Sequence, residues 1–158
     1  MFPDPLANIP SLNSIVFNNV NTISSWNVTS LSTMSSLINL IFSNCSITTI
    51  PTEIGLLSNL QSLVLHDPLL PTPLPTEISL LRNLQNLYNY VQQPLFTEIG
   101  LLSNLNNLIL NPTPNSQLPT ELGQLSNLGN LIIVKNSQMG GTLPPQLAPI
   151  PLASISLK

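Results

Sequence analysis

The residues of this sequence best suited to acid–base chemistry are His66 and Asp67, which are adjacent at the end of a predicted strand. A histidine beside an aspartate can transfer protons, but adjacent strand residues point to opposite faces and no nucleophile accompanies this pair. A solvated or hydrogen-bonded His66 is therefore the expected interpretation. Cys45, the only cysteine, occupies an inward position and is expected to be a small buried side chain rather than a reactive thiol.

A second set of ionisable groups consists of glutamates that recur at nearly equal intervals: Glu53, Glu77, Glu98 and Glu121. Stacked carboxylates can gather a cation, but exposed positions at the start of short helical turns explain these glutamates more simply. The sequence carries no catalytic triad, metal-ligand cluster, phosphate-binding loop or carboxylate pair at usable spacing. We therefore expect a protein that is not an enzyme and that has no metal and no cofactor.

The composition narrows the classes of partner. Charged residues make up only 6% of the 158 residues, and six acids against three bases give a net charge of −3. No basic patch is therefore available for nucleic acid or for an anionic membrane surface. The hydrophobic fraction of 42% is too high for a disordered chain, and no uninterrupted apolar run is long enough to span a bilayer. We expect no nucleic-acid partner and no membrane contact.

The elements that position these residues are set by an internal repeat. The segment PTEIGLLSNL, which begins at Pro51, returns as PTEISLLRNL from Pro75, FTEIGLLSNL from Phe96 and PTELGQLSNL from Pro119. Aligned L-x-x-L-x-L cores begin at seven positions: Leu12, Leu37, Leu60, Leu84, Leu105, Leu128 and Leu152. A repeat of this length is typical of a solenoid, in which each unit buries its apolar side against its neighbours.

The core leucine positions of each repeat alternate with other residues, which is the period of a short strand with one inward face. Behind each proline, apolar residues recur at three- and four-residue spacing, which indicates a single helical or 3-10 turn. The sequence therefore predicts an α/β solenoid, with one domain over residues 1–158. It has a parallel sheet of about seven short strands on one side and the helical turns on the other.

The repeats resemble those of the leucine-rich repeat superfamily, and the PTEIG-type units are most similar to the class found in plant-type receptor ectodomains. The resemblance implies a horseshoe or right-handed coil whose concave sheet binds partners. It also implies an inward asparagine at the corner after each strand. The equivalent positions here are Val20, Cys45, Pro68, Gln92, Thr113 and Asn136. Only Asn136 matches and Cys45 is an accepted substitute, so other groups are needed to satisfy the backbone at these corners.

The repeat that begins at Leu84 departs most from the pattern. It is the shortest, and it places Asn89 where a core leucine belongs. We expect a bulge that moves Tyr90 or Val91 inward, and the least regular part of the sheet.

On the concave side, the third position of each core is serine or asparagine and the fifth is mostly apolar. The predicted ligand-binding residues are Asn39, Ile41, Ser62, Val64, His66, Asn86, Tyr88, Tyr90, Asn107, Ile109, Asn130 and Ile132. An apolar stripe beside hydrogen-bonding groups suits an extended peptide or a protein surface. Two simpler explanations remain open: β-branched residues favour strands wherever they face, and Tyr88 and Tyr90 can pack over a gap.

The leading hypothesis is non-catalytic recognition of a protein or peptide, in a receptor-like setting by resemblance. The alternative is an ice-binding type of protein, because regular Asn, Ser and Thr rows with little charge can order water. The last strand presents an edge through which chains can self-associate. Residues 1–20 lack the features of a signal peptide, so the protein is cytoplasmic unless the sequence is a piece of a cell-surface protein. If it is secreted, the sequons at Asn27 and Asn44 become glycosylation sites.

Overall fold

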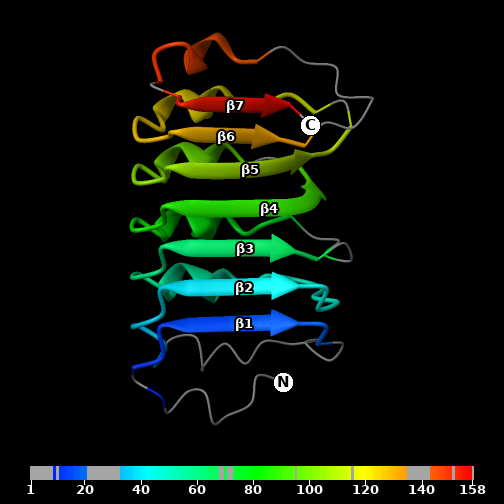
Figure 1. Cartoon of the computed structure of the whole chain (residues 1–158), viewed down its shortest axis with the longest axis vertical. Helices are drawn as coiled ribbons and strands as arrows, with labels where there is room; N and C mark the ends of the chain where they lie inside the picture. The colour runs from blue at the N-terminus through cyan, green and yellow to red at the C-terminus, as the bar shows by residue number, and fades with distance from the viewer. Residues whose placement is uncertain are drawn as a thin grey trace.

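The computed structural model describes residues 9, 11–20, 33–67, 70, 73–94, 96–114, 116–134, 143–150 and 152–157. Within them, seven short strands form one parallel sheet whose order follows the sequence (Figure 1). The strands are β1 (Ser14–Asn18), β2 (Asn39–Ser43), β3 (Ser62–His66), β4 (Asn86–Gln93), β5 (Asn107–Pro112), β6 (Asn130–Ile133) and β7 (Ser154–Leu157). The predicted solenoid with about seven parallel strands is confirmed.

The register follows the repeat, because the third residues of successive cores are direct partners across the sheet. The paired column is Ser14, Asn39, Ser62, Asn86, Asn107, Asn130 and Ser154. Side chains at equivalent positions therefore stack at one strand spacing, about 4.8 Å.

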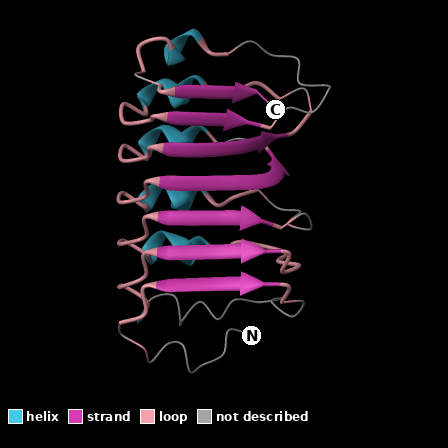
Figure 2. Ribbon diagram, viewed as in Figure 1, coloured by secondary structure: helices cyan, strands magenta, loops and turns pink. Residues whose placement is uncertain are grey.

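Short 3-10 helices lie behind the sheet, one above another (Figure 2). They are η2 (Thr52–Leu56), η3 (Thr76–Leu80), η4 (Thr97–Leu101), η5 (Thr120–Gln124) and η6 (Pro145–Leu147). Each of the first four begins after a residue with extended backbone. The residue that follows each helix donates its N–H to the carbonyl three residues earlier, as Leu57 does to Ile54. The predicted helical turns are confirmed. No described helix is long and apolar enough to cross a bilayer.

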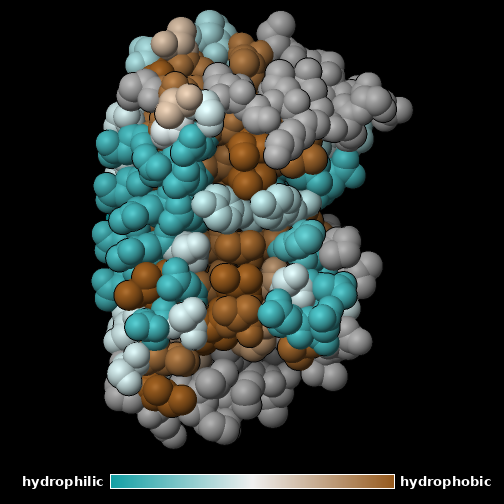
Figure 3. Space-filling view, viewed as in Figure 1, coloured by the Kyte–Doolittle hydropathy of each residue, from teal (hydrophilic) through white to brown (hydrophobic). Residues whose placement is uncertain are grey.

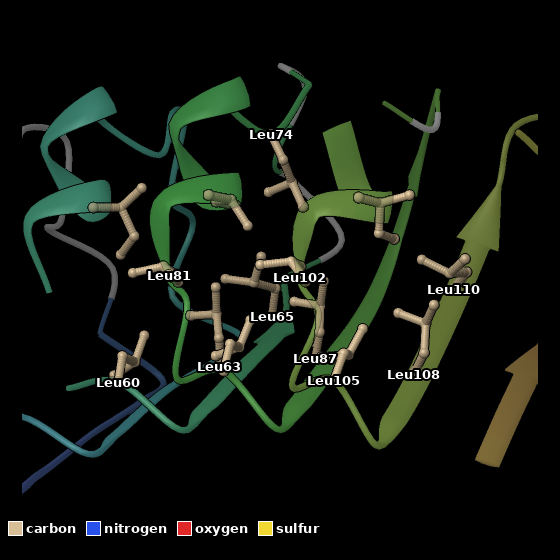
Figure 4. Close-up of a cluster of buried hydrophobic side chains, with 14 of the residues drawn as sticks. Leu60, Leu63, Leu65, Leu74, Leu81, Leu87, Leu102, Leu105, Leu108 and Leu110 are labelled. Carbon is tan, nitrogen blue, oxygen red and sulfur yellow. The ribbon is translucent and has the colours of Figure 1, made fainter. Parts of the chain in front are cut away.

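The core lies between these two layers. The first leucines of the five inner repeats are fully buried, and the outermost two, Leu12 and Leu152, are partly buried against the same cluster. In Figure 4, strand leucines such as Leu63 and Leu87 occupy the space between the sheet and turn leucines such as Leu81 and Leu102. The repeat leucines therefore share one apolar spine, as the period predicts.

The turns approach one another closely at glycines. A Cβ added to Gly100 would lie 2.6 Å from the backbone oxygen of Glu121, and one added to Gly55 would lie 2.8 Å from that of Glu77. Real Cβ atoms essentially never come this close to another heavy atom, so a side chain at either position would force the neighbouring turn to shift. These glycines therefore allow the close approach of η2 to η3 and of η4 to η5, whereas Ser79 occupies the equivalent position in η3 and is buried.

At the corner after the strands, neighbouring repeats are joined by side chains of different types. The Cys45 thiol, fully buried as predicted, donates to the carbonyl of Phe17 at 3.2 Å. Asp67 accepts the N–H of Cys45 at 3.0 Å and the N–H of Ile47 at 2.9 Å. The amide oxygen of Gln93 accepts the N–H of Leu74 at 3.2 Å. Acidic and amide groups thus bond the backbone where consensus asparagines are missing.

The inward positions expected from the resemblance are only partly correct. Cys45 is inward, but Gln92 is exposed and Gln93 is buried in its place. The cause is the bulge in β4, which moves the later residues of that strand out of the register counted from Leu84. Val20 and Thr113 are half-buried, whereas Pro68 and Asn136 lie outside the described residues.

The expected bulge lies between Tyr88 and Gln92, where the pairing of β4 with β5 changes register. Asn89 stays buried in the leucine position, and its side-chain oxygen accepts the N–H of Val91 at 3.1 Å. Val91 is the residue that turns inward, while Tyr90 remains 39% exposed. The buried amide is therefore satisfied by the local backbone that it distorts.

The corners before β3, β4, β5 and β6 have a regular ladder that the sequence analysis did not predict. The asparagine of each S-N-L or R-N-L segment donates to a carbonyl one repeat earlier. The pairs are Asn59 with Ser35, Asn83 with Ser58, Asn104 with Arg82 and Asn127 with Ser103, at 2.7 to 2.9 Å. These exposed amides join successive coils on the side where the consensus is intact.

Candidate functional site: the open face of the sheet

The side chains opposite the 3-10 turns form a surface that we call the open face. It comprises Ser14, Val16 and Asn18 of β1 and their register partners on the following strands. Its centre is an apolar column at the fifth positions: Val16, Ile41, Val64, Tyr88, Ile109 and Ile132. In Figure 3 this column appears as brown atoms crossing the strands, interrupted by a paler band at the level of β4. The sequence therefore places the expected stripe on the expected face.

A shallow hollow of about 200 Å³ lies on the open face over β4 to β7. It is lined by Tyr88, Asn107, Leu108, Ile109, Asn130, Ile132 and Ser154. The phenol ring of Tyr88 comes from the strand with the bulge, and the two isoleucines are half-buried. The hollow thus combines an aromatic ring, aliphatic surface and amides, which is the mixture that suits an apolar side chain with a polar neighbour.

The amides beside this hollow are bonded to one another. Asn107 donates to Asn86 at 2.7 Å, Asn130 donates to Asn107 at 2.6 Å and the Ser154 hydroxyl donates to Asn130 at 2.8 Å. All three bonds run in the same direction, so the amide dipoles add along the ladder. An asparagine has two N–H groups and an oxygen with two lone pairs, so Asn107 and Asn130 each keep one donor and one acceptor for a ligand.

His66 and Tyr90 lie together on the open face, where His66 ends β3 and Tyr90 is in the bulge of β4. Their rings are 5.1 Å apart and tilted by 52°. Both side chains are exposed, as the sequence predicts for His66. Asp67 points the other way and is only 1% exposed, so His66 and Asp67 do not form an acid–base pair.

The twelve predicted contact residues all lie on this face of the sheet. Asn39 and Ile41 are in β2, whereas Ser62, Val64 and His66 are in β3. Those of the later strands are Asn86, Tyr88 and Tyr90 in β4, Asn107 and Ile109 in β5, and Asn130 and Ile132 in β6. Two clusters of these residues form in the fold. One lines the hollow and includes Tyr88, Ile109 and Ile132, and the other is the ring contact between His66 and Tyr90. Asn39 and Ser62 are not hydrogen-bonded to the amide ladder in the described part of the chain.

Charge is divided between the two sides of the coil. Along described strand positions the open face carries no carboxylate, lysine or arginine. The four repeat glutamates are on the turns, where they are half-buried rather than exposed as predicted, and each accepts a hydrogen bond from the preceding threonine at 3.2 to 3.4 Å. No group of three potential metal ligands occurs among the described residues. The open face is therefore neutral and the turn face acidic.

The chain belongs to the leucine-rich repeat family, because the family model for a leucine-rich repeat region matches residues 2–144. A comparison with curated protein sequences gives no match. The family is generally non-enzymatic.

Solved structures with the same fold come from bacteria and plants. A leucine-rich repeat protein of Leptospira interrogans is 27% identical with a TM-score of 0.72, over 100% of this chain and 40% of that one. The plant peptide hormone receptor RGFR1, solved in complex with RGF2, is 24% identical with a TM-score of 0.69, over 94% of this chain and 24% of that one. Internalin InlF of Listeria monocytogenes is 22% identical with a TM-score of 0.65, over 97% and 49%. This chain thus spans less than half of each of these proteins.

Proposed function

We propose that this protein is a non-catalytic recognition module that binds a protein or peptide through its open face. The observation that carries the proposal is the apolar column, which passes the hollow at Tyr88 and is open to solvent on a sheet whose other face is buried from β2 to β6. An apolar column with a polar border is the composition of a protein-binding surface. Family membership supports the proposal, since the similar structures include a hormone receptor and an internalin.

The ladder of amides favours an extended segment of a partner. Asn107 and Asn130 each retain one donor and one acceptor beside an apolar hollow. A peptide backbone supplies the matching carbonyl and N–H groups, and one of its aliphatic side chains fills the hollow. Tyr88 is the expected anchor because tyrosine is enriched among the residues that dominate binding energy.

The test is a selection on the wild-type protein from a displayed peptide library, followed by binding measurements on variants. Tyr88→Ala and Ile109→Asp should each weaken binding of the selected peptide about tenfold or more, because both line the hollow. Glu98→Gln, on the turn face, is the matched control and should bind normally. Circular dichroism confirms that each variant is folded. Equal loss in all three variants, or a library that yields no binder, would contradict the proposal.

The ice-binding alternative is favoured by one observation, which is the column of exposed asparagines before the strands. Hydrogen bonds to the preceding repeat fix the amides of Asn59, Asn83, Asn104 and Asn127 at repeat spacing. A regular row of fixed polar groups is suited to ordering water. Thermal hysteresis measured in concentrated protein solution tests this alternative, and an unchanged freezing point would remove it.

A further inference from the structure

The turn face carries exposed leucines that the packing of the coil does not require. Leu56, Leu80 and Leu101 occupy equivalent positions in η2, η3 and η4 and are 55%, 52% and 43% exposed. The equivalent residue of η5 is Gln124, which is exposed as well. Because a glutamine serves at this position in the next repeat, the fold does not need leucine there. Three such leucines in line form an apolar strip open to solvent.

A hollow of about 230 Å³ opens between η2 and η3 along this strip. It is lined by Thr52, Glu53, Gly55, Leu56, Glu77 and Leu80. The absence of a side chain at Gly55 contributes to this hollow, because a Cβ there would meet the Glu77 backbone and the Leu80 methyl group. Two leucines and two glutamates from successive turns therefore border one depression.

The charge of this surface determines which kind of partner it can bind. Glu53, Glu77 and Glu98 lie at the starts of η2 to η4, and the lone described arginine, Arg82, is directed to the carbonyl of Leu101 at 2.8 Å. Each glutamate accepts one threonine hydroxyl and keeps its remaining lone pairs for other donors. A second copy of this chain would bring carboxylates against carboxylates. A partner with cationic side chains is complementary.

We propose that Leu56, Leu80 and Leu101, together with Glu53, Glu77 and Glu98, form a second docking surface for a cationic amphipathic segment of another protein. The aliphatic side chains of that segment cover the three leucines. Its lysines or arginines bond the carboxylates, with their aliphatic stems on the same apolar strip. This surface is on the side of the coil opposite the open face and is independent of the function proposed for that face.

The experiment uses a fluorescent, acetylated and amidated peptide of alternating leucine and lysine as the probe. Its controls are the leucine–glutamate and serine–lysine peptides of equal length. Anisotropy should show binding of the leucine–lysine probe that weakens with salt, and at least about tenfold weaker binding of both control peptides. No binding of the probe, or equal binding of all three peptides, would overturn the proposal.

Two matched sets of variants locate the binding site of the leucine–lysine peptide. The set Leu56→Gln, Leu80→Gln and Leu101→Gln copies the natural residue of η5, and together these changes should weaken binding about tenfold or more. The set Glu53→Gln, Glu77→Gln and Glu98→Gln should weaken it at low salt and remove the salt dependence. Tyr88→Ala on the open face should have no effect.

Folding of the variants is checked by thermal unfolding. If the triple leucine variant unfolds below the assay temperature, the single change Leu101→Gln, next to Gln124, replaces it and should weaken binding at least about twofold. Unchanged affinity in a folded leucine variant, or loss of binding in Tyr88→Ala, would contradict the assigned surface.

Discussion

The carboxylate of Asp67 joins two turns of the coil at the corner after β3. It is almost completely buried, and one of its oxygens accepts backbone N–H groups of both Cys45 and Ile47 from the preceding repeat. Hydrogen bonds to a charged acceptor are stronger than neutral ones, and buried donors without a partner are costly. A single side chain therefore does at this corner what a regular asparagine does in the family consensus.

Asp67→Ala should lower the free energy of unfolding by about 3 kcal/mol, because it leaves two buried N–H groups without their acceptor. Asp67→Asn keeps an acceptor oxygen and should cost clearly less. Chemical denaturation of the three proteins measures the difference. An alanine variant as stable as the wild type would contradict the assigned role.

The corner residues show why the inward position is predicted only in part by its distance from the first leucine of the repeat. The count from Leu60 assigns the inward position to Pro68, whereas the side chain that bonds the previous repeat belongs to Asp67. The count from Leu84 assigns it to Gln92, whereas the bulge gives it to Gln93. Loop length and bulges set these positions, and neither can be read from a single repeat. Cys45, in a repeat of regular length, was predicted correctly.

At the scale of elements, glycines allow close approach of the turns at Gly55, Gly100 and Gly123. The repeat analysis predicted the turns and their spacing, but not how closely they approach. Gly100 lies against the Glu121 backbone in the next turn, whereas Gly129 lies against the amide end of the Asn106 side chain. A backbone atom cannot move aside independently of its turn, but an exposed side chain can.

Gly100→Ala should therefore destabilise the protein by about 1 to 3 kcal/mol, because its Cβ would lie 2.6 Å from the oxygen of Glu121. The matched change Gly129→Ala brings its Cβ 3.2 Å from the flexible Asn106 amide and should cost less than about 1 kcal/mol. Thermal or chemical unfolding compares the two variants. The reverse order of stability would contradict the close packing of the turns.

The amide ladder joins β4, β5, β6 and β7 across the open face. The sequence predicted a column of serine and asparagine but not that the side chains bond one another. That outcome depends on rotamers, which the repeat pattern does not specify. Asn107 takes part in two ladder bonds, and Asn86 in one.

Asn107→Ala should lower the free energy of unfolding by about 1 to 2 kcal/mol because it removes two partly buried hydrogen bonds. Asn86→Ala removes one of these bonds and should cost about half as much. Denaturant titrations give both values. Equal stability of the two variants would show that the ladder is not energetically continuous.

On the scale of the whole molecule, the coil separates a neutral face from an acidic one. The repeat pattern predicted this division, because it assigned the glutamates to the starts of the turns and serine, asparagine and apolar residues to the strands. A peptide selected on the open face meets no carboxylate, lysine or arginine among the described residues. Its affinity should change less than about twofold between roughly 0.05 and 0.5 M salt. A steep loss with salt would mean that the peptide binds elsewhere.

The most direct test of the central claim is a methyl-resolved NMR titration of the protein with a peptide selected on it. The account predicts shifts at Val64, Ile109 and Ile132, which point out of the open face, and unchanged positions for the buried leucines and for Leu56 and Leu80 on the turns. Shifts confined to the turn leucines, or spread evenly through the core, would contradict recognition through the open face.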